Sequence, residues 1–441
     1  MIQKKKSGDL EIDVVSYYRD LTYTFQSRKD FDNRIDGIID ENKGDLSNCK
    51  FIFESWPEGD LYFNGLFAFK HSLHFAPMCI KINNTNKTTQ NMNSMFEHCS
   101  NLRTIPSELF DEIDFTKMLT QLSFISMFKY CISLTSFPIS ICKNLLKGSH
   151  GDNSGIFTQM FAYNGCCRMI TERNRQSFDS IFEGFSVSSE FRGLFYSSSE
   201  MKFTPNYTLF NGLTDSEDNQ LRNKMFIASA MFSSSGILSI SSSLFDIPLS
   251  LKCAHYEFNE LAENSKIKEI YSDTFRLNRG KSFSDLSTVS LNRAFARCEH
   301  LKTVSSFLTG WTVISGKYKT SMSECFSSSG VVRMTDCFIS FAIYNAQQNQ
   351  AIDMRSMFYD CKNLGSDGSL ILSDRIAISH PFEISGMFDG CSSVISAVPE
   401  LWNSDRFPNF VADHYSGENS NNVFRGCTKA SNYNEIPDGW K

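Results

Sequence analysis

Residues 95–106 read MFEHCSNLRTIP, and variants of this twelve-residue pattern return along most of the chain. We number its positions one to twelve, so that position two is Phe96, position five is Cys99 and position eight is Leu102. Self-similarity at a fixed period is the signature of a repeat array. Position two is phenylalanine in eleven places, namely Phe67, Phe96, Phe128, Phe161, Phe195, Phe232, Phe295, Phe326, Phe358, Phe388 and Phe424.

The rings at position two are 29 to 37 residues apart, except for a gap of 63 between Phe232 and Phe295. That gap is a doubled step, and it contains the degenerate stretch ELAENSKIKEI at residues 260–270. This stretch places Leu261 at position two and Ile267 at position eight. The sequence therefore predicts twelve units.

Position five is cysteine in six units, and serine or asparagine in most of the others. Residues of this kind favour a tight turn with a local hydrogen bond, and they indicate packed, reduced thiols rather than disulfides. Position eight is predicted to be a buried apolar column. Its members include Leu102, Leu238 and Val332, with Cys167 and Ala430 as weak ones.

Positions one to five have apolar residues at helix-like spacing, so we expect one short helical turn in each unit. The following residues, such as RTIP, are expected to form a short strand that ends at proline, which cannot donate to a ladder. A single unit leaves its phenylalanine open on both sides. Stacking of neighbouring units removes that surface from water, at about 1.5–3 kcal/mol for each ring.

The segments MFEHCSNLRTIP, MFKYCISLTSFP, AFARCEHLKTV, MFYDCKNL and MFDGCSSVISAVP resemble the BspA-type leucine-rich repeats of bacterial surface proteins. The resemblance extends from about residue 66 to the C-terminus, although the units are longer than ordinary leucine-rich repeats of about 20–29 residues. It implies an α/β repeat solenoid, a leucine-rich-repeat-like array of helical-turn plus strand units. We expect residues 61–441 to form this array with a C-terminal cap.

Residues 1–60 lack the repeat and are predicted to form an N-terminal cap or a docking module. The stretch DFDNRIDGIID places Phe31, Ile35, Ile38 and Ile39 on one helical face, and CKFIFESW is typical of a strand. An end of a solenoid exposes its core and requires a cover. The alternative is that this segment attaches the array to a larger assembly, such as a virion.

Charge and hydropathy limit the partners of the chain. The formal net charge is −6, which gives no overall basic field to attract nucleic acid. No run approaches the roughly 18 apolar residues of a membrane span. Acidic residues interrupt the N-terminal stretch where a secretion signal requires an apolar run. We therefore expect synthesis in the cytoplasm, with a phage virion released by lysis as the route to the exterior, or otherwise a cytoplasmic location.

No catalytic or phosphate-binding motif is present, so we predict a protein that is not an enzyme and has no cofactor. Residues 40–51 resemble the start of a calcium loop but have Phe51 where a bidentate glutamate is required. A metal site at His71, His74 and Cys79 and a redox pair at Cys166 and Cys167 remain less favoured alternatives. A hydrolase with a spatially assembled site is the least favoured reading.

Position nine carries the candidate binding residues. Six of its twelve occupants are basic and none is acidic: Arg103, Arg168, Lys202, Lys268, Lys302 and Arg333. We call these six residues the basic column. Stacked units would align them into a stripe that holds carboxylates or phosphates. The alternative is a solvated face whose long side-chain stems cover the sheet.

From these features we expect a recognition, adhesion or structural protein of a virion or another exposed surface, which binds a host-surface protein or glycan. An intracellular scaffold that binds proteins through the same face is the alternative.

Overall fold

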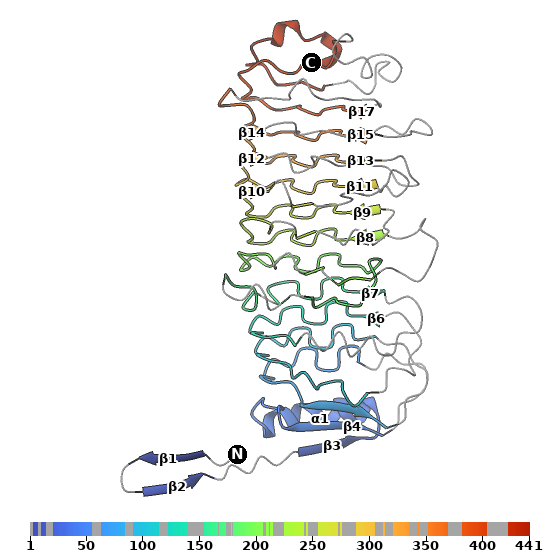
Figure 1. The fold of residues 1–441 in the computed structure, drawn as a ribbon, viewed down its shortest axis with the longest axis vertical. Coiled ribbons are helices and arrows are strands. Elements are labelled where there is room, and N and C mark those ends of the chain that lie inside the picture. The colour runs from blue at the N-terminus through green and yellow to red at the C-terminus, as the bar shows by residue number, and fades with distance from the viewer. Residues whose placement is uncertain are drawn as a thin grey trace.

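The computed structural model shows a solenoid of stacked parallel strands with little helix (Figure 1). The predicted repeat solenoid is therefore confirmed, whereas its α/β detail is not. The structure describes residues 3–7, 10–14, 21–54, 63–83, 91–113, 122–138, 154–165, 167–172, 178, 180–205, 209–210, 212–214, 225–241, 244–245, 255–271, 274–275, 288–304, 312–313, 321–334, 342–343, 352–368, 382–403 and 422–441.

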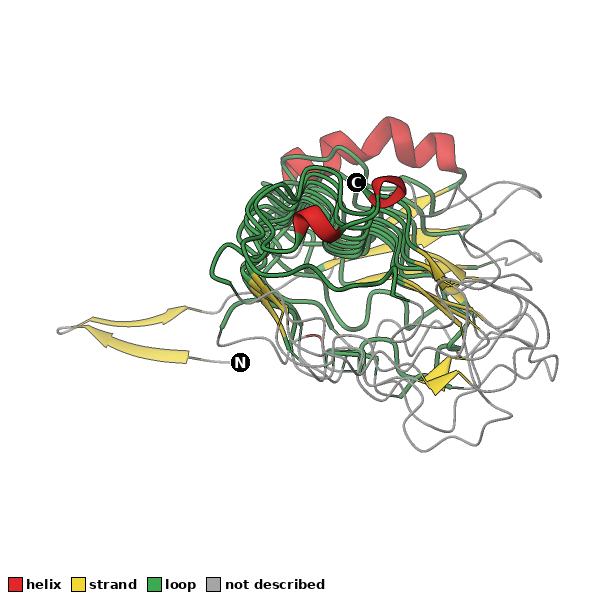
Figure 2. Cartoon of the chain, turned by 90° about the horizontal axis from the view of Figure 1, so that it is seen from above, coloured by secondary structure: helices red, strands yellow, loops and turns green. Residues whose placement is uncertain are grey.

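The helical turn expected at positions one to five is wrong. In the coil of Phe67, the N–H groups of Gly65, Phe67 and Phe69 donate to carbonyls of the next coil at 2.8–2.9 Å. The alternate N–H groups bond three residues back within their own coil. A positive φ at Gly65 and Phe69, both 61°, breaks the helical path. The segment is therefore a chain of turns that forms a ladder with its neighbours (Figure 2).

The phenylalanines of position two form the predicted internal stack. Phe96 is fully buried and lies 5.1 Å from Phe67 and 5.6 Å from Phe128, with interplanar angles of 3° and 8°. Parallel stacking continues through later coils, for example between Phe388 and Phe424 at 5.5 Å and 3°. We call these position-two rings the phenylalanine spine. Each ring covers a face of the next, so burial depends on the neighbouring coils.

The phenylalanine spine is interrupted once, and the predicted assignment of Leu261 to position two is wrong. The N–H of Ala262, not that of Leu261, makes the bond typical of position two, donating to the carbonyl of Ala294 at 2.8 Å. The thiol of Cys298 donates to the Ala262 carbonyl at 3.1 Å, as corner cysteines do elsewhere. Alanine thus occupies the ring position, which divides the spine into a ladder ending at Phe232 and another beginning at Phe295.

The cysteines at position five were predicted to make a local hydrogen bond. Their thiols instead donate to the preceding coil. Cys99 Sγ donates to the carbonyl of Phe67 at 2.9 Å, and Cys361 Sγ donates to that of Phe326 at 3.0 Å. All ten cysteines in the described part of the chain are free, and nine of them are buried. The cysteine thiol thus satisfies the carbonyl of the neighbouring ring position, whereas the buried hydroxyl of Ser235 at the same position makes no such bond.

Two parallel ladders run along the stack. Strands at positions nine to eleven, as predicted, lie on the left in Figure 1: β10 (Glu269–Ile270), β12 (Thr303–Val304) and β14 (Arg333–Met334). A second ladder, which was not predicted, comprises β6 (Leu122–Ser123), β7 (Gly155–Ile156), β8 (Met225–Ile227), β9 (His255–Glu257), β11 (Thr288–Ser290), β16 (Ile352–Asp353) and β17 (Phe382–Glu383). β13 (Thr312–Val313) pairs with β15 (Ala342–Ile343).

The N-terminal segment continues the solenoid without a break in the sheet. β3 (Leu21–Phe25), β4 (Cys49–Phe53) and β5 (Cys79–Ile82) form one parallel sheet, although β5 belongs to the first repeat. The predicted helix is α1 (Arg28–Glu41), whose N-terminus is capped by the side chain of Ser27. A separate hairpin of β1 (Gln3–Ser7) and β2 (Leu10–Val14) extends to one side (Figure 1).

Both ends of the phenylalanine spine are covered. Phe31 of α1 and Phe51 of β4 lie 5.5 Å and 6.0 Å from the first ring, Phe67. At the other end, the 3₁₀ turns Tyr433–Glu435 and Asp438–Trp440 bring Trp440 to 6.4 Å from Phe424. The predicted helical face and strand thus pack as a cover would. No helix within the described residues is long and apolar enough to cross a membrane.

Candidate functional site

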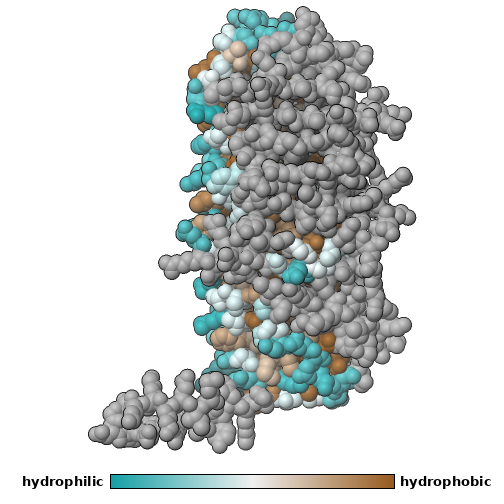
Figure 3. Space-filling view, in the orientation of Figure 1, coloured by the Kyte–Doolittle hydropathy of each residue, from teal (hydrophilic) through white to brown (hydrophobic). Residues whose placement is uncertain are grey.

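All six residues of the basic column are exposed. Position nine forms a backbone ladder, in which Arg103 donates its N–H to the carbonyl of His74 at 2.8 Å and Thr135 donates to Arg103 at 2.9 Å. Lys302 likewise donates to Lys268 at 3.4 Å. Hydrophilic side chains recur along the left edge of Figure 3, where β10, β12 and β14 lie in Figure 1.

The register of the column differs from the prediction in three coils. Ile237, Val331 and Met169 are fully buried, whereas Leu238, Val332 and Cys167, which were predicted at the apolar column, are half-buried. Leu238 and Val332 instead lie in the position-nine ladder, donating to the carbonyls of Lys202 and Lys302. The basic column is therefore interrupted by apolar residues.

A one-residue insertion displaces Arg168. Gly165, rather than Asn164, occupies the corner of this coil, because its N–H donates to Ala162 and its α-carbon faces the Phe128 carbonyl. Arg168 is exposed, but no backbone bond joins it to Thr135 or Lys202 in the described ladder. The structure thus brings Lys268 and Lys302 together, while Arg168 lies outside the register.

The charges of the basic column fall into two groups. Arg333 forms an ion pair with Asp367 at 2.7 Å, and Lys302 Nζ donates to the carbonyl of Glu299 at 3.4 Å. The four other members form neither an ion pair nor a side-chain hydrogen bond with the residues that the structure describes: Arg103, Arg168, Lys202 and Lys268. These four cations are the part of the column that can accept an anionic partner without losing an existing polar contact.

The alternative metal sites do not assemble. The exposed His71 ring lies 3.3 Å from Ser100 Oγ, whereas Cys79 is buried beside Glu112. No group of three or more His, Cys, Asp or Glu side chains that could hold a metal occurs within the described ranges. Cys166, one half of the alternative redox pair, lies outside the described residues.

A cluster of Lys50, Cys79 and Glu112 was missed from the sequence because its members are far apart in the chain. Lys50 Nζ lies 2.6 Å from a Glu112 oxygen, and Cys79 Sγ lies 3.6 Å from the other oxygen. Burial raises the pKa of Cys79 to about 11, and the hydrogen bond from Lys50 lowers the pKa of Glu112. The thiol therefore stays protonated at neutral pH, and the cluster is an ion-paired corner rather than a nucleophile.

The buried corner thiols should resist alkylation in the native protein. Burial raises the pKa of Cys99 to about 12 and that of Cys361 to about 11, so the reactive thiolate is scarce at pH 8. We expect iodoacetamide to label the half-exposed Cys167 before these two, which should react only after unfolding, as measured by peptide mass spectrometry. Denatured protein is the control. Equal labelling of Cys99 and Cys167 in the native state would contradict the buried corner.

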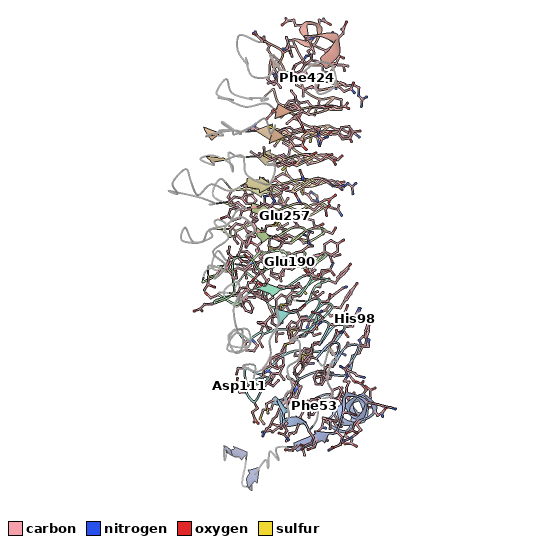
Figure 4. The ribbon with its side chains drawn as sticks, turned by 90° about the vertical axis from the view of Figure 1, so that its right-hand side faces the viewer. Phe53, His98, Asp111, Glu190, Glu257 and Phe424 are labelled. Atoms are coloured by element: carbon pink, nitrogen blue, oxygen red, sulfur yellow. The ribbon has the colours of Figure 1, made fainter. Side chains whose placement is uncertain are left out.

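Position four carries a second surface feature, which we call the surface ladder: Phe69, His98, Tyr130 and Tyr163. Its rings stack in successive coils at 4.7, 4.2 and 4.5 Å. The signal was present in the sequence, since four consecutive units have a ring there. It was missed because the sequence does not show that position four faces outward. Figure 4 shows His98 at the outer edge of the stack, on the side opposite to Asp111.

Comparisons with protein-family models, curated proteins and solved structures found no match. The resemblance to BspA-type repeats therefore stays a prediction.

Proposed function

We propose that this protein is a non-enzymatic recognition or adhesion protein that works outside the producing cell, as a virion or surface-exposed component with repeats of the BspA type. The observation that carries the proposal is the set of four exposed cations without an ion-pair partner in the described chain, on a protein with a net charge of −6. A ligand with carboxylates, sulfates or phosphates would gain charge-assisted hydrogen bonds there. Host-surface proteins and anionic glycans have this chemistry.

Rigidity supports the proposal. Arg103, Lys202 and Lys268 are attached to a hydrogen-bonded ladder over a fully buried core, so little backbone freedom is lost there when a ligand binds. The spacing between neighbouring positions is set by the coil repeat. A repetitive polymer or an extended segment can therefore contact several coils at once.

Replacement of Arg103, Arg168, Lys202 and Lys268 with serine should weaken binding to alginate and poly-L-glutamate by about tenfold or more, as measured by titration calorimetry. The salt dependence of binding should flatten, since fewer charges are screened. Melting should be unchanged because all four side chains are exposed.

A matched control removes the same number of exposed positive charges elsewhere, with serine at Lys29, Lys43, Lys362 and Lys429. This variant should bind like the parent. Equal loss in both variants would indicate a net-charge effect, and unaltered binding in the first would eliminate the basic column as the site.

Mass spectrometry of purified particles tests the location. Presence of the chain in particles supports a virion component, whereas absence together with protein binding would favour an intracellular scaffold. The proposal also expects no depolymerisation of alginate, and product release on incubation would contradict a non-enzymatic role.

A further inference from the structure

The surface ladder occupies a backbone position that is costly for large side chains. Phe69, His98, Tyr130 and Tyr163 have φ values of 61°, 62°, 62° and 53°, in the left-handed region that favours glycine. Position four in the last two coils is Gly390 and Gly426. The coil geometry requires the left-handed conformation, but it does not require an aromatic ring. Four consecutive rings therefore point to a role beyond the fold.

The rings of the ladder cover one another's faces and leave their edges exposed. Interplanar angles are 12° between Phe69 and His98, 21° between His98 and Tyr130, and 21° between Tyr130 and Tyr163. Tyr196 then meets Tyr163 edge-on at 71°. The side chain of Phe69, at the end of the ladder, is 61% exposed. The ladder is thus a ridge of ring edges with one more accessible end.

The chemistry of these edges defines what they recognise. An aromatic ring is negative on its face and positive at its edge, so outward edges complement carboxylate oxygens and the faces of other rings. Sugar rings, in contrast, pack their C–H groups on open aromatic faces, and most of these faces are already covered. The tyrosine hydroxyl groups add hydrogen-bonding capacity at the same edge.

The charged residues around the surface ladder also favour a partner that carries carboxylates. Residues 69–75, 98–104, 130–136 and 163–169, which follow the ladder around the corner of each coil, contain no Asp or Glu. They include Arg103 and Arg168 of the basic column. Lys129, whose ammonium lies 5.1 Å from the centre of the Tyr163 ring, adds a cation beside the ladder, although it is also 3.6 Å from Glu97. This corner complements an acidic partner.

We propose that the surface ladder is a docking surface for an acidic segment of a partner protein that contains aromatic residues. The inference rests on the proposed recognition function and names the partner class and the coils involved. Tyrosine and arginine are the side chains that dominate protein interfaces, and stacked rings lose little rotamer freedom on binding. The carboxylates of the partner contact Arg103 and Arg168, and its rings accept the edges of the ladder.

The test compares two polypeptide probes of equal charge: poly-L-glutamate, and a copolymer with the same number of glutamates in which tyrosines are added between them. The wild-type chain should bind the copolymer about tenfold more tightly. Serine at Phe69, His98, Tyr130 and Tyr163 should abolish this preference. The matched control carries serine at Asn264, Arg297 and Asp360, which occupy position four with φ of 55–56° in later coils, and it should keep the preference.

A second measurement uses the wild-type protein, so that the inference can be tested even if the serine variant misfolds. Hydroxyl-radical oxidation of Tyr130 and Tyr163, read by peptide mass spectrometry, should slow when the copolymer is bound. Unchanged oxidation together with binding would place the partner elsewhere and overturn the inference.

The remaining outcomes separate this inference from the proposed function. Equal affinity of the wild type for both probes, with loss of binding only in the basic-column variant, would overturn the docking surface and leave the recognition function standing. Absence of binding to every anionic probe would remove both. Tighter binding of alginate, with protection of Tyr130 and Tyr163, would assign the ladder to glycans and overturn the protein partner.

Discussion

Replacement of Phe358 with alanine is expected to lower the free energy of unfolding by about 3–5 kcal/mol. The ring is fully buried and lies 5.4 Å from Phe326 and 5.5 Å from Phe388, with interplanar angles of 7° and 6°. Truncation removes apolar contacts on both faces and leaves a cavity that two rigid coils cannot close. Because each coil contacts only its neighbours, the loss should be concentrated there.

Chemical denaturation gives the change in stability, and amide hydrogen exchange shows where it falls. Faster exchange is expected at the N–H groups of Phe326 and Phe358, which donate to carbonyls of the following coil. Tyr359→Ala is the matched control, since this neighbouring side chain is 42% exposed and its loss should cost much less. A Phe358→Ala protein that unfolds at the same denaturant concentration as its parent would contradict the spine.

The period of the phenylalanines was sufficient to predict the solenoid and the central stack of its core, but not the second set of buried rings, which includes Phe124, Phe157 and Phe191. Each ring must be covered on both faces, and the rings recur at a spacing that is visible in the sequence. Phe96 and Phe388 could therefore be assigned to the buried stack from the sequence. The same reasoning failed at Leu261, because the ring position there holds Ala262 and no aromatic side chain marks the register. The prediction of a helical turn in each unit was also wrong, since hydrogen bonds between coils replace those of a helix.

The candidate site was only partly predictable, because counting from the ring assumes that every coil has the same path. In the two FSSSG coils, the chain reaches the buried column one residue early, at Ile237 and Val331. Lys202 and Lys268 are nevertheless exposed, because in each of their coils the residue directly before the lysine is the buried one. Prediction of the surface ladder would have required the left-handed conformation at position four to be recognised. The non-glycine residues at this position do not indicate that conformation.

The shortened path in the FSSSG coils depends on glycine. The N–H of Gly330 donates to the carbonyl of Cys298 at 3.0 Å, and that of Gly236 donates to Ser198 at 3.1 Å. A Cβ on Gly330 would lie 2.0 Å from the carbonyl oxygen of Glu299, and one on Gly236 would lie 2.1 Å from that of Ser199. These two coils thus approach the preceding corner without room for a side chain, whereas Lys266 makes the equivalent bond, to the Ser235 carbonyl, at the longer distance of 3.3 Å.

Gly330→Ala is accordingly expected to destabilise the protein by about 1–3 kcal/mol, because the new methyl group displaces a backbone carbonyl that cannot move alone. Chemical denaturation should show the loss, and hydrogen exchange should show weakened protection of the residue-330 amide. Gly37→Ala in α1 is the matched control, since its Cβ would meet nothing within 4 Å, and it should stabilise by about 0.5–1 kcal/mol. The same added methyl group thus has opposite signs at the two sites. Equal effects would show that the close approach of the coils does not require glycine at residue 330. They would also contradict the explanation given for the shifted register.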